Sequence, residues 1–159
     1  MEQPSHRPAA GHAGYAGNGD RGHVHENILE LVSRACWPPP GDEGPLPAAD
    51  GLLLAELHGD IDLANTVEPR GWLDSVVALR APAYIVDLRP VTFVDSTGLN
   101  LLLRLRRRVL AGGGAFALLC PERTLRLLHA HGSLELFDPA TTLPEAVSRV
   151  TGTSERPRV

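Results

Sequence analysis

The fold of this chain is decided by residues 84–120, whose sequence is YIVDLRPVTFVDSTGLNLLLRLRRRVLAGGGAFALLC. The apolar run 84–88 predicts a buried strand, and leucines recur at helical spacing over residues 99–110. Three glycines at 112–114 end this predicted helix, and residues 115–120 predict the next strand. A strand, a loop, a helix and a second strand in this order indicate an α/β fold with a mostly parallel sheet.

Two hydroxyls and a carboxylate stand where the loop becomes the helix, in the tetrad Asp95-Ser96-Thr97-Gly98. Asp and Ser are good helix N-caps because their side-chain oxygens accept unpaired backbone N–H groups. The helix N-terminus also attracts anions, so a phosphate on Ser96 or Thr97 would be well placed there. Two interpretations follow: a hydroxyl that only caps the helix, or a hydroxyl that is phosphorylated.

A second acidic stretch, Gly59-Asp60-Ile61-Asp62, lies upstream of the tetrad. Together the two stretches are a specific pairing, and with them the sequence from about Leu52 to Val150 resembles a STAS domain of the bacterial anti-sigma-factor antagonist type. The other segments that carry the resemblance are Tyr84–Leu88, Phe93–Leu99, Gly112–Gly114, Cys120-Pro121 and Leu127–Leu134.

The resemblance implies a phosphorylation-switched binding module. In the family, a partner serine kinase that is also an anti-sigma factor phosphorylates the serine after the motif aspartate, which is Ser96 here, with Thr97 as the alternative. The unphosphorylated protein sequesters the kinase and so releases a sigma factor, and a serine phosphatase resets the switch. This implies a role in bacterial transcription regulation by partner switching, as in stress responses.

The resemblance also implies which residues contact the partner. They are the acidic residues Asp60 and Asp62 and the tetrad with its neighbours, namely Asp95, Thr97, Gly98, Leu99 and Asn100. Asn100 departs from the small glycine of many relatives. Apart from the resemblance, Asp60 and Asp62 are explained equally well by turn and cap chemistry.

Composition excludes several other functions. The 159 residues carry a formal net charge of −4, which does not favour nucleic acid, and the arginines of 104–108 are expected to form a solvated helix surface. Cys36 and Cys120 have no metal-ligand spacing and suit a reducing cytosol, so we expect a cytoplasmic protein with no metal and no cofactor. No apolar run reaches the ~18 residues that a membrane span needs, so no membrane contact is expected.

Three regions are expected along the chain. Residues 1–26 are rich in Gly, His and Ala and are expected to be a disordered arm, in which His6, His12, His23 and His25 are solvated rather than metal ligands. Residues 27–151 would form the STAS domain, with a Pro/Gly-rich loop at 38–50, and 152–159 would be a flexible tail.

The remaining segments complete the expected fold. Residues 28–37 fit a helix or a strand, and the resemblance favours a strand that forms an antiparallel hairpin with 51–58. The expected fold is therefore a single STAS domain with a mixed sheet of four to five strands and about four helices, mainly on one side. The other expected elements are helices at 65–79, 121–131 and 142–150 and an edge strand at 134–137. In the first of these helices, Pro69 and Gly71 are expected to confine the regular part to 72–79 or to make the start irregular.

Enzyme activity is not expected. The tetrad has one residue too many for an aspartic-protease motif and no second copy, and no nucleophile elbow, P-loop or zinc-protease motif is present. The alternative to the phosphorylated module is a STAS scaffold or ligand-binding module that is not phosphorylated.

Overall fold

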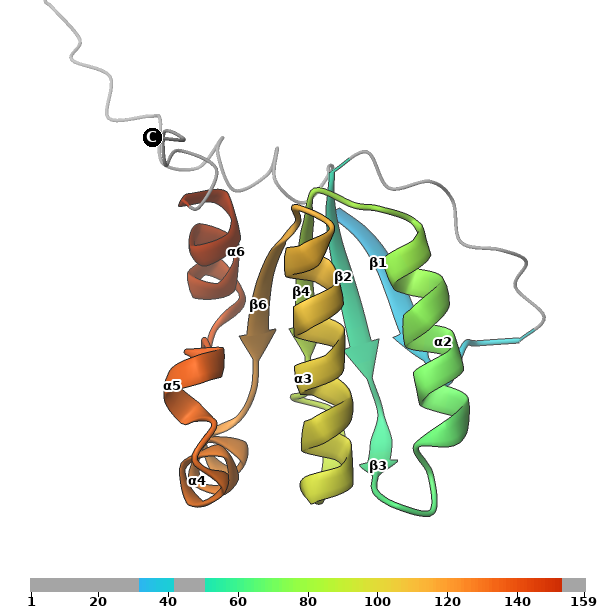
Figure 1. Ribbon diagram of the computed structural model, residues 1–159, viewed down its shortest axis with the longest axis vertical. Coiled ribbons are helices and arrows are strands. Elements are labelled where there is room, and N and C mark those ends of the chain that lie inside the picture. Colours follow the sequence, from blue (N-terminus) through green and yellow to red (C-terminus); the bar gives the residue numbers. More distant parts are fainter. Residues whose placement is uncertain (1–31, 42–50, 153–159) are drawn as a thin grey trace, which may run out of the picture. The chain divides into compact units, whose positions relative to one another are not determined.

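The computed structural model describes residues 32–41 and 51–152, and their centre is a four-stranded sheet in the order β1-β2-β4-β6 (Figure 1). All neighbouring strands in it are parallel. A second sheet pairs two short strands, β3 and β5, also in parallel. The strands are β1 Val32–Trp37, β2 Leu52–Leu57, β3 Gly59–Ile61, β4 Ala83–Asp87, β5 Val91–Val94 and β6 Ala115–Leu119.

Five helices complete the described part of the chain, in agreement with the predicted α/β class. They are α2 Val67–Ala78, α3 Ser96–Ala111, α4 Glu122–His131, α5 Leu134–Phe137 and α6 Leu143–Gly152. None of the helices within 32–41 and 51–152 combines the length and the apolar character needed to cross a membrane.

The core has two sides because successive residues of a strand point to opposite faces of the sheet. On one face Leu53, Ala55 and Val86 share a buried cluster with Leu73 of α2 and Leu102 of α3. Figure 1 shows these two helices side by side in front of the sheet. The alternate strand residues Leu54, Ile85 and Ala117 are also buried, and α6, whose buried residues are Ala146, Val147 and Val150, packs on β4 and β6.

The direction of the first strand pair differs from the prediction. Residues 32–37 form a strand beside β2, as expected, but the pair is parallel, with Val32 opposite Leu52 and Trp37 opposite Leu57. A tight hairpin can only join antiparallel strands, whereas a parallel pair needs a long connection, which residues 38–51 provide. Residues 28–31 lie outside the described part.

The predicted edge strand at 134–137 is wrong, because these residues form the short helix α5. The outer edge of β6 makes its one described pairing further along the chain, at Leu119. Ala140 forms an isolated bridge with Leu119, and its carbonyl accepts a hydrogen bond from Cys120 N–H at 3.0 Å. Residues 134–137 instead satisfy part of their backbone locally, since Phe137 N–H donates to the Ser133 carbonyl at 3.1 Å.

Three local predictions also change. Residues 59–61 and 91–94 were expected to be a turn and a loop, but they pair with each other as β3 and β5. Helix α2 begins at Val67 rather than at Trp72, since Pro69 lies in its first turn, where no N–H is needed. The arm 1–26, most of the loop 38–50 and residues 153–159 lie outside the described residues.

Candidate functional site: the start of helix α3

Ser96 is the first residue of α3, and its side chain is exposed. It lies at the carboxyl edge of the parallel sheet, the edge at which α/β proteins commonly bind ligands. Figure 1 shows that α2 and α3 both begin at this edge, next to β3. The tetrad is therefore at the surface, at the positive end of a 16-residue helix.

Asp95, and not Ser96 or Thr97, caps this helix. Its Oδ1 accepts a hydrogen bond from Gly98 N–H at 2.9 Å, and its Oδ2 accepts one from Leu63 N–H at 3.1 Å. These backbone donors, Gly98 first, lower the pKa of the Asp95 carboxyl. The carboxylate thus ties the loop after β3 to the start of α3, and capping does not require the Ser96 hydroxyl.

Gly98 and Leu99 hold the helix against the second sheet. A Cβ on Gly98 would lie only 2.2 Å from the carbonyl oxygen of Ile61, so only glycine allows this approach. The Leu99 side chain is completely buried. Gly98 and Leu99 were predicted to contact the partner, but both are buried and can only position the start of α3. Ser96 and Asn100, one helical turn apart, are exposed.

The two upstream aspartates have different environments. Asp62 is half-buried, and its Oδ1 accepts hydrogen bonds from the backbone N–H groups of Ala64 and Asn65, at 3.0 and 3.1 Å. It therefore shapes the loop that carries Leu63. Asp60 is exposed on β3 and accepts a 2.5 Å hydrogen bond from the Thr92 hydroxyl. Asp60 also lies opposite Phe93 in the strand register, which brings it to the strand that leads into the tetrad.

Exposed apolar side chains occur beside the tetrad, and the sequence did not point to them. Phe93 is 54% exposed and lies two residues before Asp95, while Leu63 is 75% exposed and its N–H is bound by Asp95. Residues 91–94 were expected to be a loop, so no face could be assigned to Phe93. We call Asp60, Leu63, Phe93, Ser96 and Asn100 the Ser96 surface.

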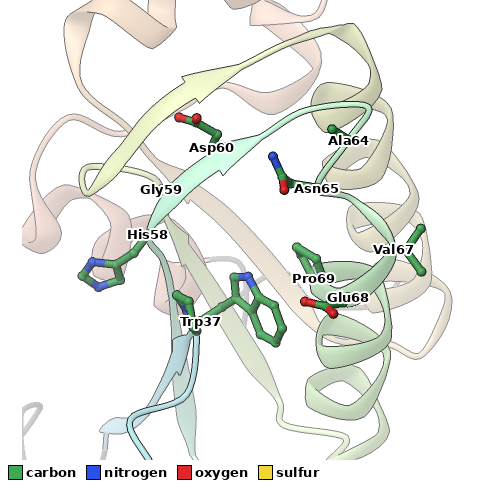
Figure 2. Close-up of a pocket in the computed structure, with 10 residues that line it drawn as sticks. Trp37, His58, Gly59, Asp60, Ala64, Asn65, Val67, Glu68 and Pro69 are labelled. Atoms are coloured by element: carbon green, nitrogen blue, oxygen red, sulfur yellow. The ribbon is translucent and has the colours of Figure 1, made fainter.

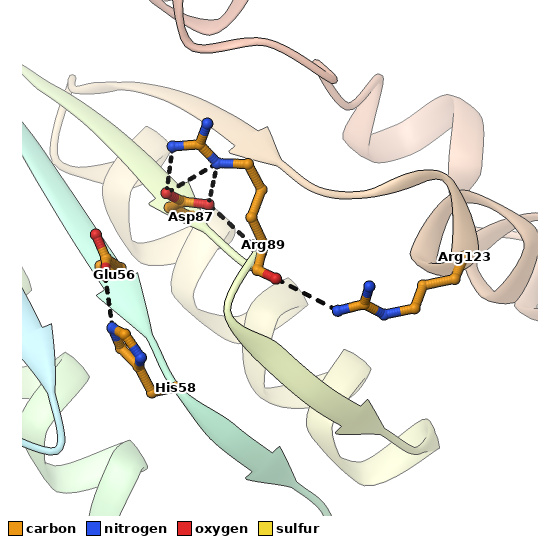
Figure 3. Close-up of polar contacts among 5 residues, drawn as sticks. All are labelled: Glu56, His58, Asp87, Arg89 and Arg123. Atoms are coloured by element: carbon orange, nitrogen blue, oxygen red, sulfur yellow. Dashed lines mark hydrogen bonds and ion pairs between the residues drawn. The ribbon is translucent and has the colours of Figure 1, made fainter.

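The connection into β5 is held by a polar network. The Asp87 carboxylate is buried and receives hydrogen bonds from Nε and Nη2 of Arg89 at 2.8 to 3.2 Å, a pairing that raises the pKa of Arg89 (Figure 3). Arg123 of α4 donates to the carbonyl oxygens of Arg89 and Val91, at 3.3 and 2.7 Å. These contacts position β5, and through it the tetrad.

An open pocket of about 640 Å³ lies between the end of β1 and the start of α2. Figure 2 shows Trp37 on one side, Asp60 and Asn65 on the other, and Glu68 and Pro69 at the start of α2. The pocket therefore adjoins the Ser96 surface through Asp60.

One group of potential metal ligands occurs among the described residues, formed by Cys36, Glu56 and His58. No metal site was expected from the sequence, because these residues have no recognisable ligand spacing along the chain. Parallel pairing of β1 with β2 brings them together.

Comparisons with known proteins give one family and several solved structures. The STAS domain model matches residues 45–146. An anti-sigma factor antagonist from Mycobacterium paratuberculosis is 28% identical, with a TM-score of 0.58 over 64% of this chain and 87% of that protein. No curated protein sequence is significantly similar to this chain.

Two further structures share the fold at lower identity. SpoIIAA, an anti-sigma factor antagonist in its unphosphorylated form, is 24% identical, with a TM-score of 0.53 over 67% of this chain and 93% of that protein. A sulfate transporter family protein from Wolinella succinogenes is 18% identical, with a TM-score of 0.53 over 75% of this chain and 98% of that protein.

Proposed function

Because the chain belongs to the STAS domain family, we propose that it is an anti-sigma-factor antagonist switched by phosphorylation. In this proposal the unmodified protein sequesters an anti-sigma factor with serine kinase activity and so releases a sigma factor in the cytoplasm. The kinase modifies Ser96, and a serine phosphatase restores the hydroxyl. The resemblance of the chain to an antagonist at 28% identity supports this kind of function.

The observation that carries the proposal is that Ser96 is exposed and does not cap the helix, because Asp95 accepts the capping hydrogen bond from Gly98 N–H. A kinase can reach such a hydroxyl without unfolding the domain. The exposed Leu63 and Phe93 offer apolar area to a partner, and Asp60 and Asn100 offer polar contacts at its border. Thr97 is half-buried and is the less accessible alternative.

The switch would act through charge. A phosphate on Ser96 adds about −1.5 to −2 charges next to the Asp95 carboxylate and places them within the Ser96 surface. The N-terminus of α3 stabilises this charge, so the domain keeps its fold. A partner that packs apolar or acidic groups there would lose affinity through desolvation and like-charge repulsion.

The test is binding of full-length variants to the partner kinase. We expect Ser96→Ala to co-purify from the native cell with a kinase-type anti-sigma factor, which is then purified and titrated. Ser96→Asp should bind it at least about tenfold more weakly than wild type, a difference of about 1.4 kcal/mol. Incubation of wild type with this kinase and ATP should add one phosphate to the peptide that contains Ser96.

Ser148→Asp is the matched control, because it adds the same charge at an exposed position of α6. It should bind as wild type does. If Ser96→Asp also binds with wild-type affinity, the charge mechanism is wrong.

The second candidate is a ligand-binding STAS module without phosphorylation, which the open pocket beside Asp60 favours. It predicts no phosphate on Ser96 after incubation with the captured partner and ATP. In that case Trp37, which lines the pocket, should change fluorescence when a ligand binds.

A further inference from the structure

Three side chains with different metal-binding atoms meet on the sheet at the ends of β1 and β2. Cys36 lies directly opposite Glu56 in the parallel register, and His58 follows Glu56 by two residues, so it returns to the same side. The Cys36 sulfur, a Glu56 carboxylate oxygen and a His58 ring nitrogen all lie within 4.8 Å of one another. Figure 3 shows Glu56 and His58 next to each other on this edge, and their closest atoms are 2.5 Å apart.

The backbone under these side chains is rigid. Cys36 and Glu56 lie inside paired strands, and the ladder continues past β2, since His58 N–H donates to the Trp37 carbonyl at 2.8 Å. The positions of all three residues are therefore set by the sheet rather than by a loop. Rigid elements hold a metal site more precisely than loops do.

We propose that Cys36, Glu56 and His58 form a zinc-binding site with three protein ligands and an open fourth position. Thiolate, imidazole and carboxylate are the ligands that Zn²⁺ uses in proteins. With metal–ligand bonds of about 2.0–2.3 Å in a tetrahedron, neighbouring ligand atoms are about 3.3–3.7 Å apart. The three ligand atoms lie within 4.8 Å of one another, near this spacing, and Glu56 and His58 would have to separate from their present 2.5 Å.

The charges of the site suit a divalent cation. A thiolate and a carboxylate supply two negative charges, which Zn²⁺ neutralises, and the Cys36 thiol releases one proton when it binds. Arg89 is the nearby cation, and its attraction to Glu56 opposes metal binding. However, the Asp87 carboxylate is bound to the Arg89 guanidinium and offsets its charge. His58 and Glu56 side chains are 47% and 24% exposed, so an ion can enter from solvent.

A surface His–Glu ion pair is the simpler explanation of two of the three residues. This ion pair does not account for the position of the Cys36 sulfur, which lies within 4.8 Å of both the Glu56 carboxylate oxygen and the His58 ring nitrogen. The proposed site does not include Ser96, and His58 immediately precedes β3, the strand that carries Asp60.

The test uses Co²⁺ as a spectroscopic substitute for Zn²⁺ on the reduced, full-length protein. We expect one equivalent of Co²⁺ to give a thiolate-to-cobalt charge-transfer band and the visible bands of tetrahedral Co²⁺, which Zn²⁺ then abolishes. Cys36→Ser should remove the charge-transfer band. Glu56→Gln and His58→Gln should each weaken Zn²⁺ binding by more than the roughly 10–100-fold that is typical of changes to residues that hydrogen-bond the metal ligands.

Two controls exclude other ligands. His129→Gln removes an exposed imidazole on α4 and should leave the spectrum unchanged. A variant with His6, His12, His23 and His25 all changed to Gln should keep the charge-transfer band, because these residues are outside the proposed ligand set. Circular dichroism checks that each variant is folded.

Binding of Co²⁺ without a thiolate band would overturn the proposal. So would a band that survives Cys36→Ser, or a band that is lost when the four N-terminal histidines are replaced. A band lost only in the Cys36 variant, with weakened binding in the Glu56 and His58 variants, supports it.

Discussion

At the scale of single residues, Gly98 decides how closely α3 approaches β3. Its missing side chain leaves room for the Ile61 carbonyl, which would be 2.2 Å from a Cβ. The same approach lets the Asp95 side chain reach both Gly98 N–H and Leu63 N–H. The position of the start of α3, and with it of Ser96, therefore depends on a glycine that lies two residues further along the chain.

Gly98→Ala should destabilise the domain. The added methyl group forces the start of α3 away from β3, and overpacking of this kind costs about 1–3 kcal/mol of unfolding free energy. Urea denaturation measures the change as a lower midpoint.

Gly71→Ala is the matched control, since Gly71 also lies in a helix and no atom would come within 4 Å of its Cβ. It should leave stability unchanged or raise it by up to about 1 kcal/mol, because alanine favours a helix. A loss in Gly71→Ala as large as that in Gly98→Ala would contradict the role assigned to the contact with Ile61, because helix propensity alone predicts a gain in both variants.

At the scale of elements, carboxylates fix α2 and α3 in place. Asp74 of α2 accepts a hydrogen bond from Arg104 of α3 at 2.7 Å and also pairs with Arg108. The Arg104 hydrogen bond is the main reason that the pKa of Asp74 is lowered. Asp95 fixes the other end of α3, and its pKa is lowered by the backbone N–H groups that it binds, Gly98 first.

These lowered pKa values predict that acid weakens the fold. Both carboxyls bind protons less readily in the folded chain than in the unfolded chain, where the pKa of Asp is about 3.9. Their stabilising contribution is therefore complete above about pH 4 and is lost as the pH falls through the folded pKa values.

Asp95→Asn should reduce this acid sensitivity. The amide oxygen can still accept a hydrogen bond from Gly98 N–H, but it does not titrate, so the variant should lose less stability than wild type between about pH 6 and pH 3.5. Urea midpoints at the two pH values provide the measurement. An equal or larger loss in the variant would contradict the role assigned to Asp95.

At the scale of the whole molecule, α2 and α3 cover one face of the four-stranded sheet and α6 packs on the other. Cys120 directly follows β6 and is buried in this core. Its side chain is completely buried, and burial, aided by the negative charge of Asp87, raises the pKa of the thiol to about 12. Because only the thiolate reacts rapidly, Cys120 should be inert while the domain is folded.

The labelling rate of Cys120 should therefore report global unfolding. In a Cys36→Ser variant at pH 8, a thiol reagent should modify Cys120 only as fast as the domain opens, and the rate should rise with urea in step with unfolding. Wild type should show an additional fast phase from Cys36, which is half-buried. Fast labelling of Cys120 without urea would mean that the core opens locally near β6.

The sequence by itself determined the α/β class and the elements whose signal is local. The helical spacing of leucines predicted α3, the apolar runs predicted β2, β4 and β6, and Pro121 and the Thr142–Glu145 pattern marked α4 and α6. At α6, Glu145 N–H donates to the Thr142 hydroxyl at 3.4 Å, which is the contact that a Thr three residues before a Glu makes at a helix start. The tetrad was found in the same way, because Asp, Ser, Thr and Gly at a helix start carry their chemistry in adjacent positions.

Only the tertiary structure decided which strands pair, in which direction and with which neighbours. It made β1 and β2 parallel, made 134–137 a short helix rather than an edge strand, and joined 59–61 to 91–94. The same pairing brought Cys36 to Glu56 and left Phe93 exposed beside Ser96. The reason is physical: helix periodicity and caps depend on residues within about four positions, whereas strand partners and exposed faces depend on contacts between residues far apart in the chain.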